Sequence, residues 1–110
     1  MSDCIFCNIV SGKFDTEFLG ETEHSVAFRD INPEAEVHIL VVPKLHCRDV
    51  VELASTNEAG LVDVANLAAK MARDFTADGA FKLIFNTGDS AGQTVFHAHA
   101  HVLSNLPKSA

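Results

Sequence analysis

The stretch from Val95 to Val102, with the sequence VFHAHAHV, places half of the chain's six histidines at every second position. Successive side chains of an extended strand point to opposite faces, so residues two apart share a face. On a helix, positions two apart diverge by about 200°, which would separate the histidines. The alternation therefore predicts a strand over 94–103 with a row of three imidazoles on one face: His97, His99 and His101.

This row predicts a functional site because imidazole exchanges a proton near neutral pH, acts as a nucleophile when neutral and binds metals. Neighbours in the row would lie roughly 6.5 to 7 Å apart at their Cα atoms, so several rings can surround one phosphate-sized group or one metal ion. A metallohydrolase site with zinc on all three histidines is one alternative. A solvated strand face with histidines as ordinary polar residues is the other, and it explains the strict alternation less well.

Length and composition indicate a single globular domain, 1–110, because 47% of the residues are hydrophobic, 21% are charged and no repeat divides the chain. The net charge is −7 with only eight lysines and arginines, which excludes a protein that coats nucleic acid. The N-terminal segment does not resemble a signal peptide, and no apolar run suits a membrane span. We expect a cytoplasmic protein whose three cysteines are thiols or metal ligands.

Hydrophobic patterning predicts an α+β fold. Apolar residues recur at helical spacing over 57–75, and a short helical turn is expected at 4–10. Five strands are expected from their apolar and β-branched residues: 17–20, 24–29, 37–42, 81–85 and 94–103. One long helix before the last two strands indicates an antiparallel sheet of about five strands, covered on one side. Pairing with a second copy would protect the edges of so small a sheet.

The polar loop 86–92 leads directly into the histidine strand. Gly88 and Gly92 permit positive φ and close backbone approach, so N–H groups of this loop can donate to a phosphate beside the imidazoles. A plain hairpin connection is the alternative. The loop lacks the lysine and the following helix of a Walker motif. Among the dispersed carboxylates, Asp30 stands out because it directly follows a predicted strand.

Cys4 and Cys7 have the CxxC spacing that supplies half of many zinc sites. His46 and His97 are of the right type to complete a Cys2His2 tetrahedron, which would tie the N-terminal segment to the sheet and leave no open position for catalysis. Two buried thiols in the core are the alternative. Cys47 adjoins His46, but adjacent residues on an extended segment point apart, so we expect this thiol to be passive.

These motifs resemble the histidine triad (HIT) family, whose signature is His-x-His-x-His followed by two apolar residues, as in 97–103. Three further blocks are similar in order and spacing to the Hint branch of that family: 28–33, 38–46 and 86–94. The resemblance covers nearly the whole chain. It implies an HIT-like α+β fold with one long and one short helix, and a homodimer in which two five-stranded sheets join into one.

The resemblance also implies an activity, the hydrolysis or transfer of purine nucleoside monophosphates from phosphoramidates or related AMP conjugates through a covalent nucleotidyl-histidine. By matching position, His99 is the nucleophile, with His101, His97 and Thr94 as further catalytic residues. The implied substrate-binding residues are Phe28, Asp30, Ile31, Asn86, Gly92, Gln93, Thr94, His99 and His101. Asp30 would hold the ribose hydroxyls, and no metal is required on this route. Thr94 departs from the serine usual at its position, on the leaving-group side.

Zinc-containing bacterial members of the family resemble this chain in their N-terminal CxxC. Their ligands match Cys4, Cys7, His46 and His97, so the resemblance allows a structural zinc. The two histidines cannot be ligands and proton relays at once, and the sequence leaves both assignments open.

Two other functions compete with the phosphoramidase. The first is a dinucleoside polyphosphate hydrolase of the same family. The second is a zinc-stabilised dimer that binds nucleotides or protein partners and would not need His99. The short chain and the Hint-like blocks favour the phosphoramidase.

Overall fold

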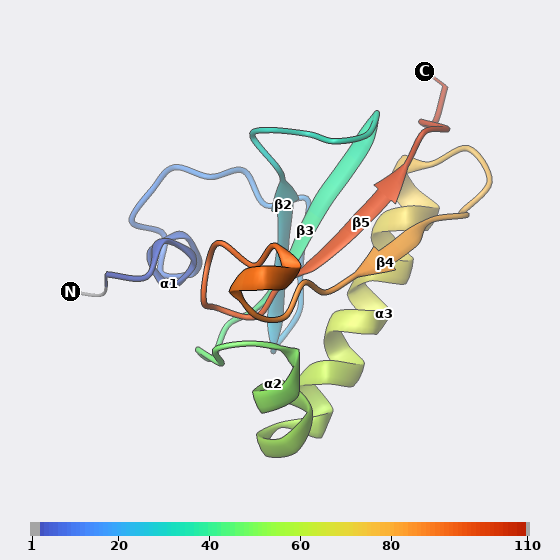
Figure 1. Ribbon diagram of the computed structural model, residues 1–110. Coiled ribbons are helices and arrows are strands. Elements are labelled where there is room, and N and C mark those ends of the chain that lie inside the picture. The colour runs from blue at the N-terminus through green and yellow to red at the C-terminus, as the bar shows by residue number, and fades with distance from the viewer. Residues whose placement is uncertain (1–2, 110) are drawn as a thin grey trace.

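The computed structural model describes residues 3–109, in which one antiparallel sheet is flanked by helices (Figure 1). The strands are β1 (Gly20–Glu21), β2 (Ser25–Arg29), β3 (Val37–Pro43), β4 (Lys82–Ile84) and β5 (Ala100–Ser104), in the spatial order β1-β2-β3-β5-β4. The helices are α1 (Ile5–Val10), α2 (Val50–Thr56) and α3 (Glu58–Phe75), with a 3-10 turn, η1 (Asp89–Ala91). The predicted α+β class with a five-stranded antiparallel sheet is confirmed. The single domain over 1–110 stays a prediction, and residues 1–2 and 110 lie outside the described part.

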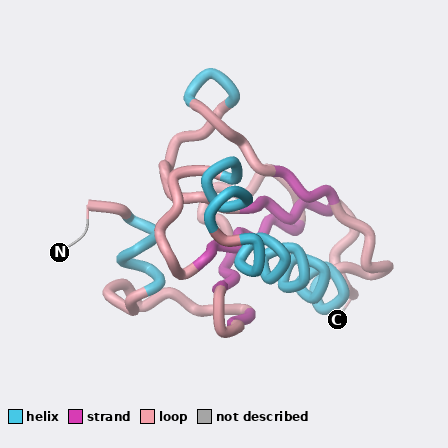
Figure 2. Tube along the Cα trace, turned by 90° about the horizontal axis from the view of Figure 1, so that it is seen from below, coloured by secondary structure: helices cyan, strands magenta, loops and turns pink. Residues whose placement is uncertain are grey.

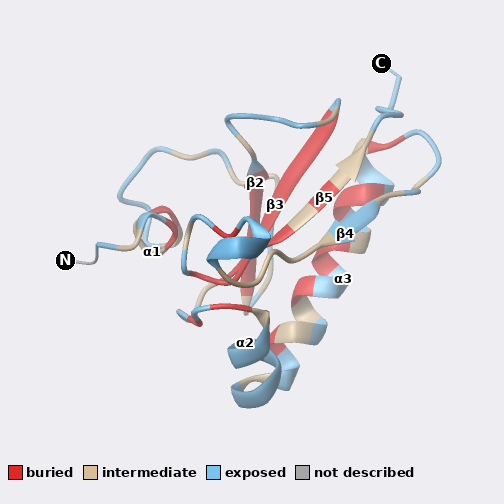
Figure 3. Cartoon of the chain, viewed as in Figure 1, coloured by how far each residue is buried: buried red, intermediate tan, exposed pale blue. Residues whose placement is uncertain are grey.

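Both faces of the sheet are covered, because alternate side chains of β3 enter two different apolar clusters. Ile39 and Val41 pack against α3, whereas Leu40 and Val42 pack with Phe6 of α1 on the opposite face. Figure 2 shows α1 and α3 as separate coils with strands between them. The expected sheet covered on one side is therefore too simple. Every residue of β3 is buried, as Figure 3 shows, because α1 covers part of the second face.

The histidine strand is shorter than the sequence predicts. The hydrogen-bonded ladder of β5 begins only at Ala100, and residues 95–97 form bends before it. The predicted alternation nevertheless extends beyond the ladder, since Ala98, Ala100 and Val102 all belong to the core on the α3 side. His99 and His101 consequently face away from α3, into the side of the sheet that α1 covers.

Three other elements differ from the sequence expectations in length or number. β1 consists of two residues that pair with Ala27 and Val26, and it replaces the strand expected at 17–20. β4 has three residues instead of the expected five. α2 was not predicted, because only Leu53 of its seven residues is buried and a single buried residue makes no periodic pattern. The structure thus has two short helices beside the long one.

Asn57 stands between α2 and α3 and serves both helices. Its backbone N–H donates to the carbonyl oxygen of Leu53 at the end of α2, and its side-chain oxygen accepts from the N–H of Gly60, 3.0 Å away, at the start of α3. A Cβ built at position 60 would come within 2.8 Å of Cγ of Asn57, so glycine there leaves room for the cap. Among residues 3–109 no helix is both long enough and apolar enough to cross a membrane.

We expect Asn57→Ala to lower the unfolding free energy by about 1 kcal/mol, because the N–H of Gly60 loses its acceptor at the start of α3. Urea denaturation followed by circular dichroism measures the change. Asn57→Asp keeps an acceptor and is the matched control. Equal losses in both variants would contradict the capping role.

Candidate active site and metal centre

Four side chains from three distant segments converge near α1. Cys4 precedes α1, Cys7 lies within it, His46 follows β3 and His97 precedes β5, and one ligand atom from each lies within 4.8 Å of every other. The predicted Cys2His2 set is thus brought together in space. The CxxC spacing brings the two thiols close together within one helical turn. α1 begins at the residue after Cys4, and the sulfur of Cys4 accepts from the N–H of Cys7 at 3.4 Å.

The distances within this cluster fit a tetrahedral zinc ion. Ligands at about 2.3 Å for sulfur and 2.0 to 2.1 Å for nitrogen from one centre lie about 3.5 Å apart as S···N pairs and about 3.3 Å apart as N···N pairs. Nδ1 of His97 lies 3.4 Å from the sulfur of Cys4 and 3.5 Å from that of Cys7. Nδ1 of His46 lies 3.4 Å from the Cys7 sulfur and 3.2 Å from Nδ1 of His97. These residues would hold zinc with all four positions filled.

The hydrogen bond at the second nitrogen of His97 supports metal binding through Nδ1. Nε2 lies 2.8 Å from the carbonyl oxygen of Pro43, which can only accept, so Nε2 carries the proton and Nδ1 presents its lone pair to the cluster. Burial lowers the pKa of His97 below its usual range, which favours the neutral ring that a metal requires. The His97 ring lines neither of the cavities that contain the other two histidines.

His99 has the opposite tautomer to His97, and its ring faces the side of the sheet that α1 covers. Its Nδ1 lies 2.8 Å from the carbonyl oxygen of His97, so Nδ1 donates and Nε2 keeps a free lone pair. Burial lowers the pKa of His99, although the carbonyl of His97 and the charge of Asp30 oppose this shift. Phe6 packs edge-on against the ring, with centroids 4.9 Å apart. The result is a neutral, oriented imidazole with the electronic character of a nucleophile.

The backbone N–H of Glu34 sets the tautomer of His101, acting through the ring of His38. The N–H of Glu34 donates to Nδ1 of His38 at 3.0 Å, so the proton of a neutral His38 must be on Nε2. That Nε2 lies 2.9 Å from Nδ1 of His101 and 3.4 Å from Oδ2 of Asp30, so it donates to His101 across the shorter distance. His101 is left with its own proton on Nε2. Burial, followed by its histidine neighbours, lowers the pKa of His101.

His38 is the site residue that the sequence analysis missed, since it was assigned no role. The β3–β5 register pairs Leu40 with His101 and His38 with Leu103, so His38 is the diagonal neighbour of His101 on the same face. The signal available in the sequence was one polar residue inside an apolar strand, two positions before Leu40 and so on the same face. Because both faces of β3 are buried, no alternation of apolar and polar residues marked that face.

A second group of metal-ligating types does not fit a metal ion. Asp30, His38 and His101 offer atoms within 4.8 Å of one another. A ligand lone pair on Nε2 of His38 would require the proton on Nδ1, and Nδ1 already accepts from the N–H of Glu34. This group is therefore a hydrogen-bonded chain. The alternative of zinc on all three histidines of the row has no matching cluster among residues 3–109.

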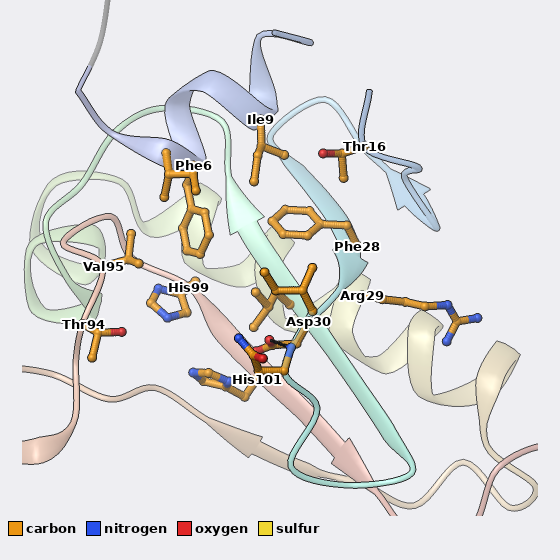
Figure 4. Close-up of a pocket in the computed structure, with 14 residues that line it drawn as sticks. Phe6, Ile9, Thr16, Phe28, Arg29, Asp30, Thr94, Val95, His99 and His101 are labelled. Atoms are coloured by element: carbon orange, nitrogen blue, oxygen red, sulfur yellow. Dashed lines mark hydrogen bonds between the residues drawn. The ribbon is translucent and has the colours of Figure 1, made fainter. Parts of the chain in front are cut away.

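The rings of His99 and His101 line two adjoining cavities. The apolar cavity, about 310 Å³, has Phe6, Phe28 and Asp30 in its wall (Figure 4). Its full lining is Ile5, Phe6, Ile9, Thr16, Phe28, Arg29, Asp30, Ile31, Asn32, Leu40, Thr94, Val95, His99 and His101. The predicted residues Phe28, Asp30, Ile31 and Thr94 thus lie in one wall with both histidines. Residues of α1 complete it, and the sequence analysis did not foresee their part.

The polar cavity, about 430 Å³, lies beside the first and shares both imidazoles with it. Its lining comprises Asp30, Asn32, Glu34, Asn86, Gly92, Thr94, His99 and His101. The loop before β5 forms one side, and its Gly88 and Gly92 have the expected positive φ, at 91° and 94°. Asn86 is held by a bond from its Nδ2 to the carbonyl oxygen of Ala91 at 3.0 Å.

Gln93 lines neither of these cavities. It is 2% exposed, and its side chain bonds within the protein: Nε2 donates to the carbonyl oxygens of Arg48 and Val95, and Oε1 accepts from the N–H of Gly88. The expected phosphate neighbour is therefore a brace that holds the loop between Gly88 and Val95.

We expect the purified protein to contain about one zinc ion per chain and Cys7→Ser to lose it, with the unfolding free energy lowered by about 2 kcal/mol or more. Cys47→Ala removes a thiol outside the cluster and should keep the metal. Elemental analysis and thermal unfolding measure both effects. Cys7→Ser with full zinc content and unchanged stability would exclude this ligand set.

Two-bond ¹H–¹⁵N correlation NMR tests the tautomers directly. At pH 7.5 we expect the proton on Nδ1 of His99 and on Nε2 of His101, because a carbonyl and the Glu34–His38 chain impose them. His38→Phe removes the donor to His101 and should mix its tautomers while His99 keeps its own. A common tautomer for both rings in the wild type would contradict the assignment.

Residues 11–107 match the HIT domain family. The chain is 32% identical over 106 residues to a purine nucleoside phosphoramidase of Escherichia coli strain K12, with 96% of this chain and 89% of that protein covered. A HIT family hydrolase from Clostridium thermocellum has the same fold, with a TM-score of 0.87, 40% identity, and 94% and 90% of the two chains covered. A Zn-bound histidine triad family protein from Mycobacterium smegmatis gives a TM-score of 0.77 at 34% identity, over 97% of this chain and 76% of that one. This chain belongs to the HIT domain family of hydrolases and nucleotide-binding proteins.

Proposed function

We propose that this protein is a purine nucleoside phosphoramidase, which transfers a nucleoside monophosphate to Nε2 of His99 and then to water. The observation that carries the proposal is the opposed protonation of two adjacent rings, whose centroids are 5.0 Å apart. Nε2 of His99 is a lone-pair donor, and Nε2 of His101 is a proton donor. One ring can attack phosphorus while its neighbour binds a phosphoryl oxygen.

The two cavities suit the parts of a nucleotide. A base can pack against the apolar wall that contains Phe6 and Phe28, whose rings contact each other edge to face with centroids 5.8 Å apart. Asp30 lines both cavities together with the two imidazoles, and a carboxylate accepts hydrogen bonds from both hydroxyls of a ribose. The phosphate then falls beside His99 and His101, where the polar cavity begins. Asn86 and the backbone of Gly92 face the same space.

In the first step, Nε2 of His99 forms a bond to phosphorus and the P–N bond of the substrate breaks. The electron pair of that bond goes to the departing nitrogen, which takes a proton from water through the hydroxyl of Thr94. The hydroxide that remains is neutralised by the proton released in the second step. The imidazole of His99 becomes positively charged, and the carbonyl of His97 stabilises that charge through Nδ1. His101 donates to the phosphoryl oxygens throughout and keeps its proton.

In the second step, water attacks phosphorus, the bond to His99 breaks and its lone pair returns to Nε2. One proton of the water passes to solvent, and the nucleoside monophosphate leaves. Both steps proceed through side chains and backbone groups of the two cavities. We infer that Cys4, Cys7, His46 and His97 hold a structural zinc, so that His46 and His97 take no part in proton transfer.

The homodimer and the cytoplasmic location remain predictions. The short outer strand β4 supports the first, because its free edge could pair with that of a second copy and Leu83, 40% exposed, would be covered. The mass of the protein in solution tests the dimer.

Hydrolysis of adenosine 5′-phosphoramidate tests the proposed function. We expect His99→Ala to lower kcat/KM by about a thousandfold or more, since no other group can form the intermediate. His24→Ala, in the turn between β1 and β2, is the matched control and should keep wild-type activity. Equal rates from wild type and His99→Ala, or none from either, would favour a nucleotide-binding protein. Faster turnover of a diadenosine polyphosphate would favour that hydrolase class.

A further inference from the structure

A single proton on His38 lies between two acceptors of the proposed nucleotide site. Nε2 of His38 is 2.9 Å from Nδ1 of His101 and 3.4 Å from Oδ2 of Asp30. A neutral imidazole has one N–H, and the N–H of Glu34, which donates to Nδ1 of His38 at 3.0 Å, places that proton on Nε2. One donor therefore faces two acceptors, and the shorter distance assigns it to His101 in this structure.

The ring of His38 is held in this position. Its side chain is 1% exposed, and its ring packs against that of His101 with centroids 5.1 Å apart. A second proton on the ring would displace the hydrogen bond from the N–H of Glu34. The acceptor that receives the proton of His38 must therefore depend on which other donors reach Asp30 and His101.

Asp30 is the acceptor whose partners a substrate would change. Its Oδ1 accepts from the N–H of Asn32 at 2.8 Å, and its side chain is 19% exposed, so further donors can reach it. Figure 4 shows Asp30 beside His101 in the wall of the apolar cavity. Hydrogen bonds to a charged acceptor are roughly twice as strong as those between neutral groups. A carboxylate that is cut off from other donors would therefore draw the proton of His38 away from His101.

The tautomer of His101 depends on the same proton. The hydrogen bond from His38 to Nδ1 keeps the proton of His101 on Nε2, which binds a phosphoryl oxygen in the proposed reaction. Without this donor the proton of His101 can move to Nδ1, and a lone pair on Nε2 would then face the phosphate. In that tautomer His101 no longer stabilises the charge on the phosphoryl oxygens.

We propose that His38 is a positioning residue that couples recognition of the ribose hydroxyls at Asp30 to the binding of the phosphate by His101. This inference rests on the proposed function and deepens it. A ribose with both hydroxyls supplies donors to Asp30, so His38 stays with His101. A deoxy sugar leaves the carboxylate short of donors while the bound base keeps water from it. Selectivity for ribonucleotides then acts on the rate of the bound substrate as well as on affinity.

Kinetics on three substrates test the coupling: adenosine 5′-phosphoramidate, its 2′-deoxy form and its 2′,3′-dideoxy form. We expect kcat of the wild type to fall in that order, by about tenfold or more between the first and the last, because His101 loses its tautomer. KM should rise as well, since bonds to Asp30 are lost. Hydroxyls that contributed to binding alone would change KM and leave kcat as it is.

Two variants of His38 separate positioning from a structural role. His38→Gln carries an amide with two N–H groups, one for each acceptor, and should keep kcat on the ribose substrate within about threefold while the difference in kcat between the sugars disappears. His38→Phe has no donor and should lower kcat on all three substrates to one common value. In both variants the difference in KM persists, because Asp30 is unchanged. His24→Gln, in the turn between β1 and β2, is the matched control and should keep the wild-type pattern.

The tautomer of His101 gives a readout that does not depend on turnover. Adenosine and 2′,3′-dideoxyadenosine, which lack a phosphate, are each added to the ¹⁵N-labelled wild type. With adenosine the proton should stay on Nε2 of His101, whereas with the dideoxy nucleoside the two tautomers should mix.

The outcomes distinguish this inference from the proposed function. Turnover that depends on His99 but has equal kcat for the three sugars would overturn the coupling alone. A difference in kcat that survives both His38→Gln and His38→Phe would do the same, as would one tautomer of His101 with both nucleosides. No turnover of any of the three substrates would overturn the proposed function and this inference with it.

Discussion

The antiparallel pairing of β3 with β5 is the constraint on which the rest of the site depends. It sets Leu40 opposite His101 and thereby brings His38 diagonally beside it. The end of the same strand carries the carbonyl of Pro43, which accepts from His97. A shift of this register by one residue would turn His38 to the opposite face and separate the two rings. The pairing is well protected, because both strands lie inside the sheet and β3 is buried along its whole length.

Backbone groups, more than charged side chains, decide which ring nitrogen of each histidine carries the proton. The carbonyls of Pro43 and His97 hold protons on His97 and His99, and the N–H of Glu34 acts on His101 through His38. Backbone positions cost no side-chain entropy to hold, and they do not titrate. Three neutral imidazoles within a short segment thus acquire three different uses: one ring faces a cluster of thiols, one presents a lone pair and one presents a proton.

Much of this arrangement follows from local patterns in the sequence. The alternation around His99 gives the face of the imidazoles, the helical spacing gives α3, and Gly88 and Gly92 give the shape of the loop. What the sequence could not show depends on pairing between distant segments. β3 is one apolar run in the sequence because helices cover both of its faces. The sequence therefore did not show on which face of the sheet His38 lies. α2 escaped notice because it buries a single side chain.

The role of Gln93 and the wall formed by α1 were hidden for the same reason. Gln93 follows a polar loop and was predicted to bind substrate, yet its side chain bonds within the protein, and one of these bonds goes to Arg48, far away in sequence. Phe6 and Ile9 belong to the short helical turn expected at 4–10, which was given no part in binding, and they line the apolar cavity. Their placement requires the packing of α1 against β2 and β3, which no short-range pattern contains.

α1 contributes both to the thiol–imidazole cluster and to the wall of the apolar cavity. Its six residues are too few to form a stable helix alone, and its inner turn carries both Cys7, in the thiol–imidazole cluster, and Phe6, in contact with His99. An ion held by the cluster and a nucleotide bound in the apolar cavity would therefore contact the same helix. If each ligand stabilised α1, thermodynamic linkage would make each raise the affinity of the other. The supply of metal would then be felt as a change in how tightly the chain holds nucleotides.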